Sequence, residues 1–207
     1  MYLSRVAIDV KRYESMKALY NLEILHGMIE SSFEGERKRN LWRVDRMGGQ
    51  DYLLLLSKMP PQTNSLPEQI GYTDSAWETK PYDGLLTRIT EGSKWFFRLT
   101  ANPTVATPAK GRKRGKVKAI TIVPKQREWL KRQSIAKGFL LQEDRFDVVQ
   151  SEWRTIKKAG KEIQIFASTF EGVLTVTDTE AFCKSLTEGI GREKAFGMGL
   201  LTVIPYA

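Results

Sequence analysis

Short runs of alternating apolar and polar residues in the first half of the chain are typical of strands, and longer amphipathic runs are typical of helices. The pattern predicts four strands, at residues 2–10, 40–47, 52–56 and 94–100. It also predicts a helix over residues 15–33, capped by Ser15, and a short helix over residues 82–90. The Pro-punctuated residues 61–81 are expected to form a long connection. This β-α-β-β-α-β order is that of a ferredoxin-like unit.

The second half repeats the same order more loosely. Its predicted elements are strands at residues 115–123, 139–157, 162–176 and 199–206, and helices at 125–137 and 178–188. We therefore predict an α+β protein of two tandem ferredoxin-like (RRM-like) βαββαβ domains. The expected division is an N-terminal domain at 1–100, a linker with the start of a basic loop at 101–114, and a C-terminal domain at 115–207. The C-terminal domain would hold a basic helix and a glycine-rich loop.

Composition narrows the class of protein. Of 207 residues, 41% are hydrophobic, which is enough for a sizeable core, and no apolar run predicts a membrane-spanning helix or a signal peptide. The single cysteine, Cys183, excludes an internal disulfide, and the single histidine, His26, excludes a histidine-cluster metal centre. We expect a cytoplasmic protein with no metal site, no cofactor and no membrane partner.

Positive charge is concentrated in one segment. The chain holds 33 Lys and Arg against 24 Asp and Glu, for a net charge of +9, and residues 110–137 contain eleven basic residues and one acid, Glu128. Such a block is typical of a polyanion-binding surface, with nucleic acid as the first candidate and an acidic membrane surface as the second. The alternative is a solvated charged loop. The candidate RNA contacts here are Lys110, Arg112, Lys113, Arg114, Lys116, Lys118, Arg127 and Lys131.

Four glycines fall within Gly189–Gly199, between a predicted helix and the last strand. Because glycine permits positive φ and close backbone approach, this segment is a candidate phosphate-binding loop. It does not follow a strand and open a helix, so it is not the dinucleotide fingerprint, and a glycine-rich turn without a ligand is the alternative. The candidate RNA contacts in this loop are Gly191, Arg192, Lys194, Gly197 and Gly199.

His26 is the candidate for proton transfer. On the predicted helix it lies at the border between the apolar face and the acidic residues Glu23 and Glu30. An imidazole titrates near neutrality, which suits general acid–base chemistry. A structural or merely exposed histidine is the alternative.

An aromatic run, Trp95, Phe96 and Phe97, stands beside Arg98, a further candidate RNA contact. Aromatic rings on an open ferredoxin-like sheet can stack unpaired bases. Because successive strand residues alternate between faces, at least one of these three rings must belong to the core.

Several segments spread over the whole chain resemble one family. They are Met1–Val6, Leu19–Gly27, Phe97–Thr104, Phe170–Val176, Gly189–Gly191 and Gly199–Leu201. In combination they resemble the CasE-type CRISPR repeat endoribonucleases of the RAMP superfamily, the RNA-processing subunit of the Cascade complex. The resemblance implies two facing ferredoxin-like domains, a CRISPR repeat stem-loop as substrate and other Cascade subunits as partners. It also implies metal-independent cleavage by the RNA 2′-hydroxyl, leaving a 2′,3′-cyclic phosphate and a 5′-hydroxyl, with the product retained.

The resemblance assigns the catalytic histidine to His26. Members of the family often carry a tyrosine three residues earlier, where this chain has Glu23. Tyr20 precedes His26 by six residues, which places it about 120° away on an ideal helix. Tyr20 and Glu23 both stay candidates for the second catalytic group, and Glu23 would act by favouring an imidazolium that protonates the leaving 5′-oxygen.

Two other readings stay open. One is a non-catalytic RNA-binding subunit of the same fold, with His26 in a structural role. The other is a small-molecule enzyme that binds a nucleotide at the glycine loop, which the large basic block disfavours.

Overall fold

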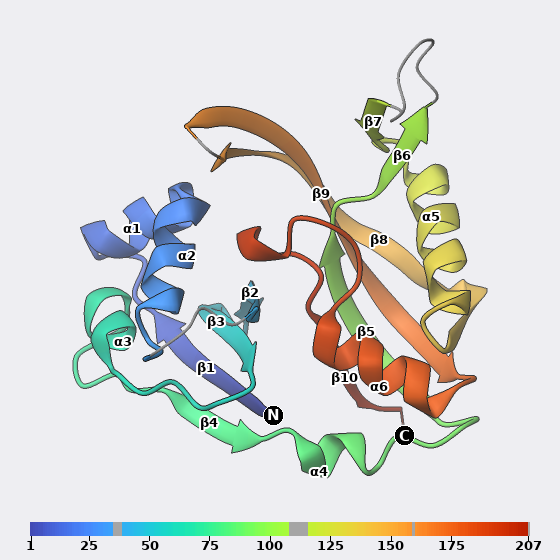
Figure 1. Cartoon of the computed structure of the whole chain (residues 1–207), viewed down its shortest axis with the longest axis horizontal. Coiled ribbons are helices and arrows are strands. Elements are labelled where there is room, and N and C mark those ends of the chain that lie inside the picture. The colour runs from blue at the N-terminus through green and yellow to red at the C-terminus, as the bar shows by residue number, and fades with distance from the viewer. Residues whose placement is uncertain (35–38, 108–115, 159, 207) are drawn as a thin grey trace.

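Two four-stranded antiparallel sheets form the framework of the described part of the chain (Figure 1). The computed structural model describes residues 1–34, 39–107, 116–158 and 160–206. Each sheet takes its strands from one β-α-β-β-α-β succession, with helices packed on one face. The predicted α+β architecture of tandem ferredoxin-like units is therefore confirmed.

The first sheet is built from the N-terminal part of the chain. Its strands, in spatial order, are β2 (Leu41–Met47), β3 (Gln50–Ser57), β1 (Tyr2–Ile8) and β4 (Glu78–Pro81). Its helices are α1 (Tyr13–Tyr20), α2 (Leu22–Glu30) and α3 (Ser65–Ile70). Val6 and Ile8 of β1 are buried in the same core as Leu25 and Ile29 of α2. Burial of these apolar side chains explains why the helices cover this face of the first sheet.

The second sheet follows the short helix α4 (Asp83–Leu86). Its strands, in spatial order, are β10 (Leu201–Pro205), β5 (Lys94–Ala101), β9 (Lys161–Val176) and β8 (Phe139–Lys158). Helices α5 (Val123–Ile135) and α6 (Thr179–Glu188) share a core with it, and the 3₁₀ turn η1 (Lys194–Phe196) precedes β10. Trp95 and Phe97 of β5 are buried in that core, whereas Phe96 is 44% exposed, as the alternation of strand faces predicts.

The predicted place of the strand at 94–100 is wrong. We expected it to close the first unit, but β5 lies between β9 and β10 in the second sheet. The fourth strand of the first sheet is β4, inside the segment predicted to be only a connection. β4 is four residues long and largely exposed, so it carries no apolar alternation that could reveal it. A division of the chain by sheets would fall between β4 and β5.

The strand predicted at 115–123 does not join either large sheet. β7 (Lys116–Ala119) pairs with β6 (Thr104–Thr107) as a separate two-stranded ribbon, in the register Thr104–Ala119 to Thr107–Lys116. This ribbon is inserted between β5 and α5 and stands away from the sheets (Figure 1). Residues 108–115, including most of the predicted basic loop, lie outside the described residues.

The single helix predicted over 15–33 is two helices. Asn21 has an extended backbone (φ −118°, ψ 93°), and its side chain accepts a hydrogen bond from the Glu23 N–H, which caps α2. Asparagine favours this capping geometry, so it ends one helix and begins the next. Ser15 is not a cap: it is buried within α1, and its hydroxyl donates to the Ile70 carbonyl, 3.0 Å away.

The β8–β9 hairpin extends well beyond its sheet and curves over the helices of the first unit (Figure 1). Near its tip, Ile156, Ile165 and Ala167 join the core that contains α2. The two units therefore share a core at the helix that carries His26.

Among the described residues, no helix has the length and apolar character needed to cross a membrane.

Candidate functional site

His26 lies in the middle of α2, beside the core residues Leu22, Leu25 and Ile29. Its side chain is half-buried, so the border position predicted from the sequence is confirmed. The Nδ1 atom is buried and has no hydrogen-bond partner among the residues that the structure describes. Buried polar atoms are normally paired. His26 is therefore not held by a hydrogen bond of this nitrogen within the described part of the chain.

The two candidate partners of His26 lie in the solvent. Tyr20 is the last residue of α1 and is 92% exposed. Glu23 is exposed in the first turn of α2, where its backbone N–H is used by the Asn21 cap. The break at Asn21 means that the helical-wheel angle between Tyr20 and His26 does not apply. The described contacts join neither residue to His26.

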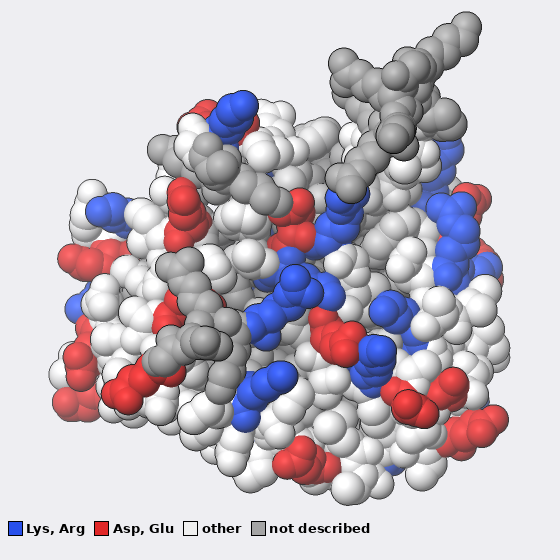
Figure 2. All heavy atoms as spheres, viewed as in Figure 1, with Lys and Arg blue, Asp and Glu red and all other residues white. Residues whose placement is uncertain are grey.

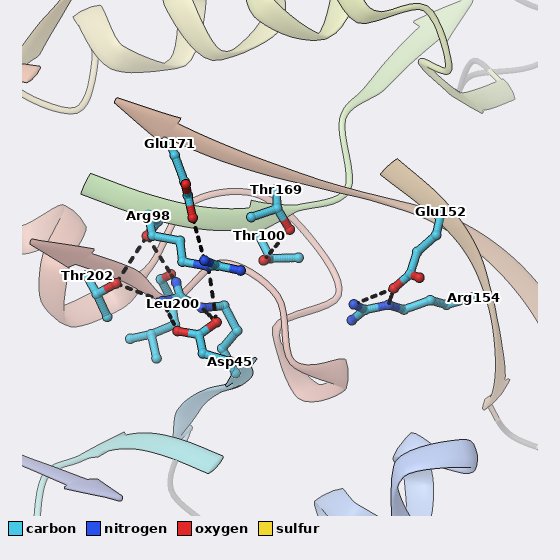
Figure 3. Close-up of polar contacts among 10 residues, drawn as sticks. Asp45, Arg98, Thr100, Glu152, Arg154, Thr169, Glu171, Leu200 and Thr202 are labelled. Carbon is cyan, nitrogen blue, oxygen red and sulfur yellow. Dashed lines mark hydrogen bonds and ion pairs between the residues drawn. The ribbon is translucent and has the colours of Figure 1, made fainter. Parts of the chain in front are cut away.

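An arginine that the sequence analysis did not single out lies on the hairpin that covers α2. Arg154 of β8 shares a strand face with Ile156, which is buried in the core of α2. Its guanidinium is paired with Glu152, from Nε to Oε1 at 2.7 Å (Figure 3). Because β8 is rich in polar and charged residues, the sequence pattern gave no signal that singled out Arg154. Arg154 is therefore a cation on the side of the hairpin that faces the histidine helix.

Of the basic loop at residues 110–118, only the C-terminal end is described. Lys110, Arg112, Lys113 and Arg114 lie outside the described residues, and Lys116 is placed by its backbone alone, opposite Thr107. Lys118 lies on β7 opposite Val105, and both side chains are exposed. The ribbon thus presents at least one cation to solvent.

Arg127 and Lys131, on α5, are engaged within the protein. Arg127 forms ion pairs with Glu143 and with Asp147 (3.5 Å), and its guanidinium lies 4.9 Å from the centre of the Phe146 ring. Lys131 hydrogen-bonds Glu143 and thereby lowers the pKa of that carboxyl. These two predicted RNA contacts therefore also hold α5 against β8.

Arg98 lies between the two sheets rather than beside the ribbon. It pairs with Asp45 of β2, from Nε to Oδ1 at 3.3 Å, and with Glu171 of β9 (Figure 3). The side chain is about one-third exposed, at 34%. The structure thus shows Arg98 as a cross-sheet contact, and its part in RNA binding stays a prediction.

A buried arginine strengthens the same junction. Arg43 of β2 forms a bidentate pair with Asp45, at 2.7 and 2.6 Å, and both are at most 5% exposed. The remaining donors of Arg43 reach the carbonyls of Arg98 and Leu200 and the Thr202 hydroxyl. This pair was not predicted from the sequence, although two opposite charges at alternate positions of a largely buried strand signal it.

The glycines of the Gly189–Gly199 loop fit tightly against the protein. Gly197 and Gly199 are buried, and a Cβ on Gly197 would lie 2.7 Å from the Trp42 ring. Gly191 has a φ of +89°, in the left-handed region that favours glycine. The need for glycine at these positions is thus explained by packing and backbone conformation, and a phosphate-binding role stays a prediction.

The two cations of this loop differ. Arg192 is exposed. Lys194 is half-buried and its Nζ donates to the Glu188 carbonyl at 2.6 Å, at the C-terminal end of α6. Burial lowers the pKa of Lys194, and the nearby charges of Arg39 and Lys137 lower it further. Arg39 and Lys137, from two other segments, therefore lie close enough to disfavour the charged form of Lys194.

Charge is unevenly spread over the molecule. Figure 2 shows Lys and Arg side chains gathered through the middle and right of one face, with acidic side chains more frequent toward its left and lower edges. Within the described ranges, no three His, Cys, Asp or Glu side chains are grouped so that they could hold a metal ion.

Comparison with known proteins agrees with this geometry. Residues 1–205 match the family model for "CRISPR associated protein". The chain is 28% identical to CRISPR-associated endoribonuclease Cse3 of Thermus thermophilus over 221 residues, which cover 99% of this chain and 100% of the relative. A structure of Cse3 bound to a 19-nucleotide RNA superposes with a TM-score of 0.82 at 27% identity, covering 99% of this chain and 100% of that one.

Two further structures share the fold. The CRISPR-associated protein Cas6e of Escherichia coli has a TM-score of 0.62 at 25% identity, with both chains fully covered. A chain of a CRISPR RNA-guided surveillance complex has a TM-score of 0.71 at 21% identity, again over the whole of both chains. The resemblance predicted from the sequence is confirmed by these matches. The chain belongs to the family of CRISPR-associated proteins.

Proposed function

We propose that this protein is an endoribonuclease that cleaves the repeat stem-loops of CRISPR transcripts. The observation that carries the proposal is His26: the only imidazole of the chain is half-buried at the junction of the two units, and its Nδ1 has no hydrogen-bond partner among the described residues. The similarity to the endoribonuclease Cse3 over almost the whole chain supports the same reaction.

The proposed reaction needs no metal ion. The 2′-oxygen next to the scissile phosphate attacks phosphorus, the bond to the 5′-oxygen breaks, and the products are a 2′,3′-cyclic phosphate and a 5′-hydroxyl. One proton leaves the 2′-hydroxyl and one is gained by the 5′-oxygen, and His26 is proposed to carry one of these transfers. General acid–base catalysis of this kind contributes about 10²–10⁴-fold, and holding the strand in line contributes much of the rest.

The charged groups of the site support the binding of a polyanion. Arg154 faces the histidine helix from β8 and is proposed to stabilise the charge that develops on the phosphate. The ribbon residues Lys116 and Lys118, together with Lys110, Arg112, Lys113 and Arg114 of the preceding segment, are proposed to contact the phosphates of the RNA stem. Contacts to backbone charge suit A-form RNA, whose deep major groove hides its base edges.

We further propose that the enzyme acts in the cytoplasm and retains its cleaved RNA as a subunit of Cascade. The similarity in fold to a chain of an RNA-guided surveillance complex is consistent with this assembly.

The test is cleavage of a repeat-hairpin RNA in EDTA by wild-type protein and by His26→Ala, with binding measured separately. We expect wild-type cleavage to persist in EDTA. His26→Ala should lose about 10²–10⁴-fold in single-turnover cleavage rate while still binding the RNA. Met16→Ala, on the exposed surface of α1, is the control and should cleave normally. Unchanged cleavage by His26→Ala would reject the assignment.

The second candidate is a non-catalytic RNA-binding subunit. It is favoured by Glu23, which stands where the family often has tyrosine, and by the exposure of Tyr20. Tight RNA binding by the wild type with no cleavage, with or without added divalent metal, would establish this alternative.

A further inference from the structure

The β8–β9 hairpin has two different faces where it leaves its sheet. Ile156, Ile165 and Ala167 are buried with α2 on one face. Trp153 and Phe166 are directly paired across the strands and lie on the opposite face, because side chains alternate along a strand. The face that carries Trp153 is thus turned away from the histidine helix.

Trp153 is unusually exposed for a tryptophan. It is 55% exposed, whereas Trp42, Trp95 and Trp129 are at most 6% exposed. Its ring meets the buried Phe166 ring at 71°, with 5.0 Å between the ring centres. This edge-to-face contact fixes the indole on a two-stranded support without covering it.

A chain of hydrogen bonds connects this face to the basic ribbon. The Ser151 hydroxyl, two residues before Trp153, donates to Gln126 Oε1 at 3.3 Å. Gln126 Nε2 in turn donates to the Ile120 carbonyl at 2.9 Å, directly after β7. The exposed tryptophan therefore lies on the same side of the hairpin as the first turn of α5, where Lys125 is exposed.

We propose that Trp153 stacks on an unpaired nucleobase of the bound RNA, next to the stem gripped by the ribbon. This inference rests on the proposed function. An exposed indole held against a second ring, on the same side of the hairpin as the exposed Lys125, suits the binding of an unpaired base, which combines stacking on an aromatic ring with nearby positive charge. A tryptophan that served the core alone would face α2, where the apolar residues of this hairpin are buried.

The expected effect is on RNA affinity and on the environment of the indole. Replacing a stacking aromatic residue by alanine weakens binding by roughly 5- to 100-fold. Trp153→Ala should weaken binding of a repeat-hairpin RNA with unpaired flanks in this range, whereas Trp153→Phe should keep most of the affinity. Val149→Ala, which removes a similarly exposed apolar side chain from the same strand, is the matched control and should bind normally.

The experiment combines two measurements on the full chain. Acrylamide quenching of tryptophan fluorescence is compared with and without saturating RNA, and the difference between wild type and Trp153→Phe isolates the signal of Trp153. RNA should protect that signal from quenching. The affinity measurement is repeated with RNAs that carry single abasic nucleotides in the unpaired flanks. One abasic position should remove the affinity difference between wild type and Trp153→Ala.

The outcomes separate this inference from the function on which it rests. If the RNA binds and is cleaved but leaves Trp153 equally open to quenching, the stacking proposal is overturned and the indole is left as a surface for a protein partner. If no repeat RNA binds at all, the proposed function fails and the stacking proposal fails with it. Circular dichroism and thermal unfolding of the variants distinguish lost stacking from lost folding.

Discussion

Arg43 of β2 donates a hydrogen bond to the carbonyl of Leu200, 2.7 Å away, and so joins the first sheet to the segment that leads into the last strand of the second. Its partner Asp45 holds the other side of the guanidinium and also pairs with Arg98. Buried ion pairs with every donor used fix geometry more than they add stability. The relative placement of the two sheets therefore depends on this junction.

Arg43→Met should destabilise the fold. It leaves Asp45 buried without its bidentate partner, which typically costs about 3–5 kcal/mol. Chemical denaturation monitored by circular dichroism measures this as a lower free energy of unfolding. Arg46→Met is the control, because Arg46 is exposed on the same strand. A change of less than about 1 kcal/mol in Arg43→Met would contradict the proposed importance of the junction.

Tyr20→Phe should leave RNA cleavage unchanged. Tyr20 is 92% exposed on α1, and the extended residue Asn21 separates it from the helix of His26. The Tyr20 hydroxyl is thus not fixed in position by surrounding residues, as a catalytic group normally is. Single-turnover cleavage is the measurement. If the cleavage rate falls by more than about tenfold while RNA binding stays normal, Tyr20 is the second proton-transfer group of the site.

Lys118→Ala should reduce the salt dependence of RNA binding. Each lost phosphate contact lowers the slope of log affinity against log salt concentration by about 0.7–0.9. Arg127→Ala is the comparison, and its slope should change less because Arg127 is already paired with Glu143 and Asp147. Filter binding over a range of salt concentrations gives both slopes. Equal slopes for wild type and Lys118→Ala would exclude that side chain from the phosphate contacts.

Gly197→Ala should lower thermal stability. Gly197 has a φ of +73°, and an added Cβ would approach the Trp42 ring to 2.7 Å. Backbone strain and overpacking together should cost about 2 kcal/mol or more. Gly84→Ala is the control, since a Cβ there meets nothing within 4 Å. If Gly197→Ala unfolds at the wild-type temperature yet loses RNA affinity, the glycine is required by the ligand and not by packing.

The sequence predicted the elements with a strong local signal. The long strands β8 and β9 and the helix α6, with its Asp178 cap, have clear periodicity or capping residues. The position of His26 at the edge of a buried helix face was also readable, because it follows from residues within two turns. These features depend on neighbours in the chain, which is why the pattern revealed them.

Features that depend on distant partners were not predictable in the same way. The strand at 94–101 has a clear strand pattern, yet only its pairing with β9 and β10 decides its sheet. From the sequence alone Arg98 appears as an unpaired cation, because its partners Asp45 and Glu171 come from distant strands. In the same way, Arg127 and Lys131 look available for RNA until β8 supplies their carboxylates.

The shared core beneath the β8–β9 hairpin has a consequence for how the molecule can be divided. Ile156, Ile165 and Ala167 complete the packing around α2. The apolar face of the helix that carries His26 is therefore fully covered only when the C-terminal half is present. An N-terminal fragment on its own would expose that apolar surface to water. The two halves share one architecture, but we expect neither to fold fully as an independent module, because the helix that carries His26 packs against both.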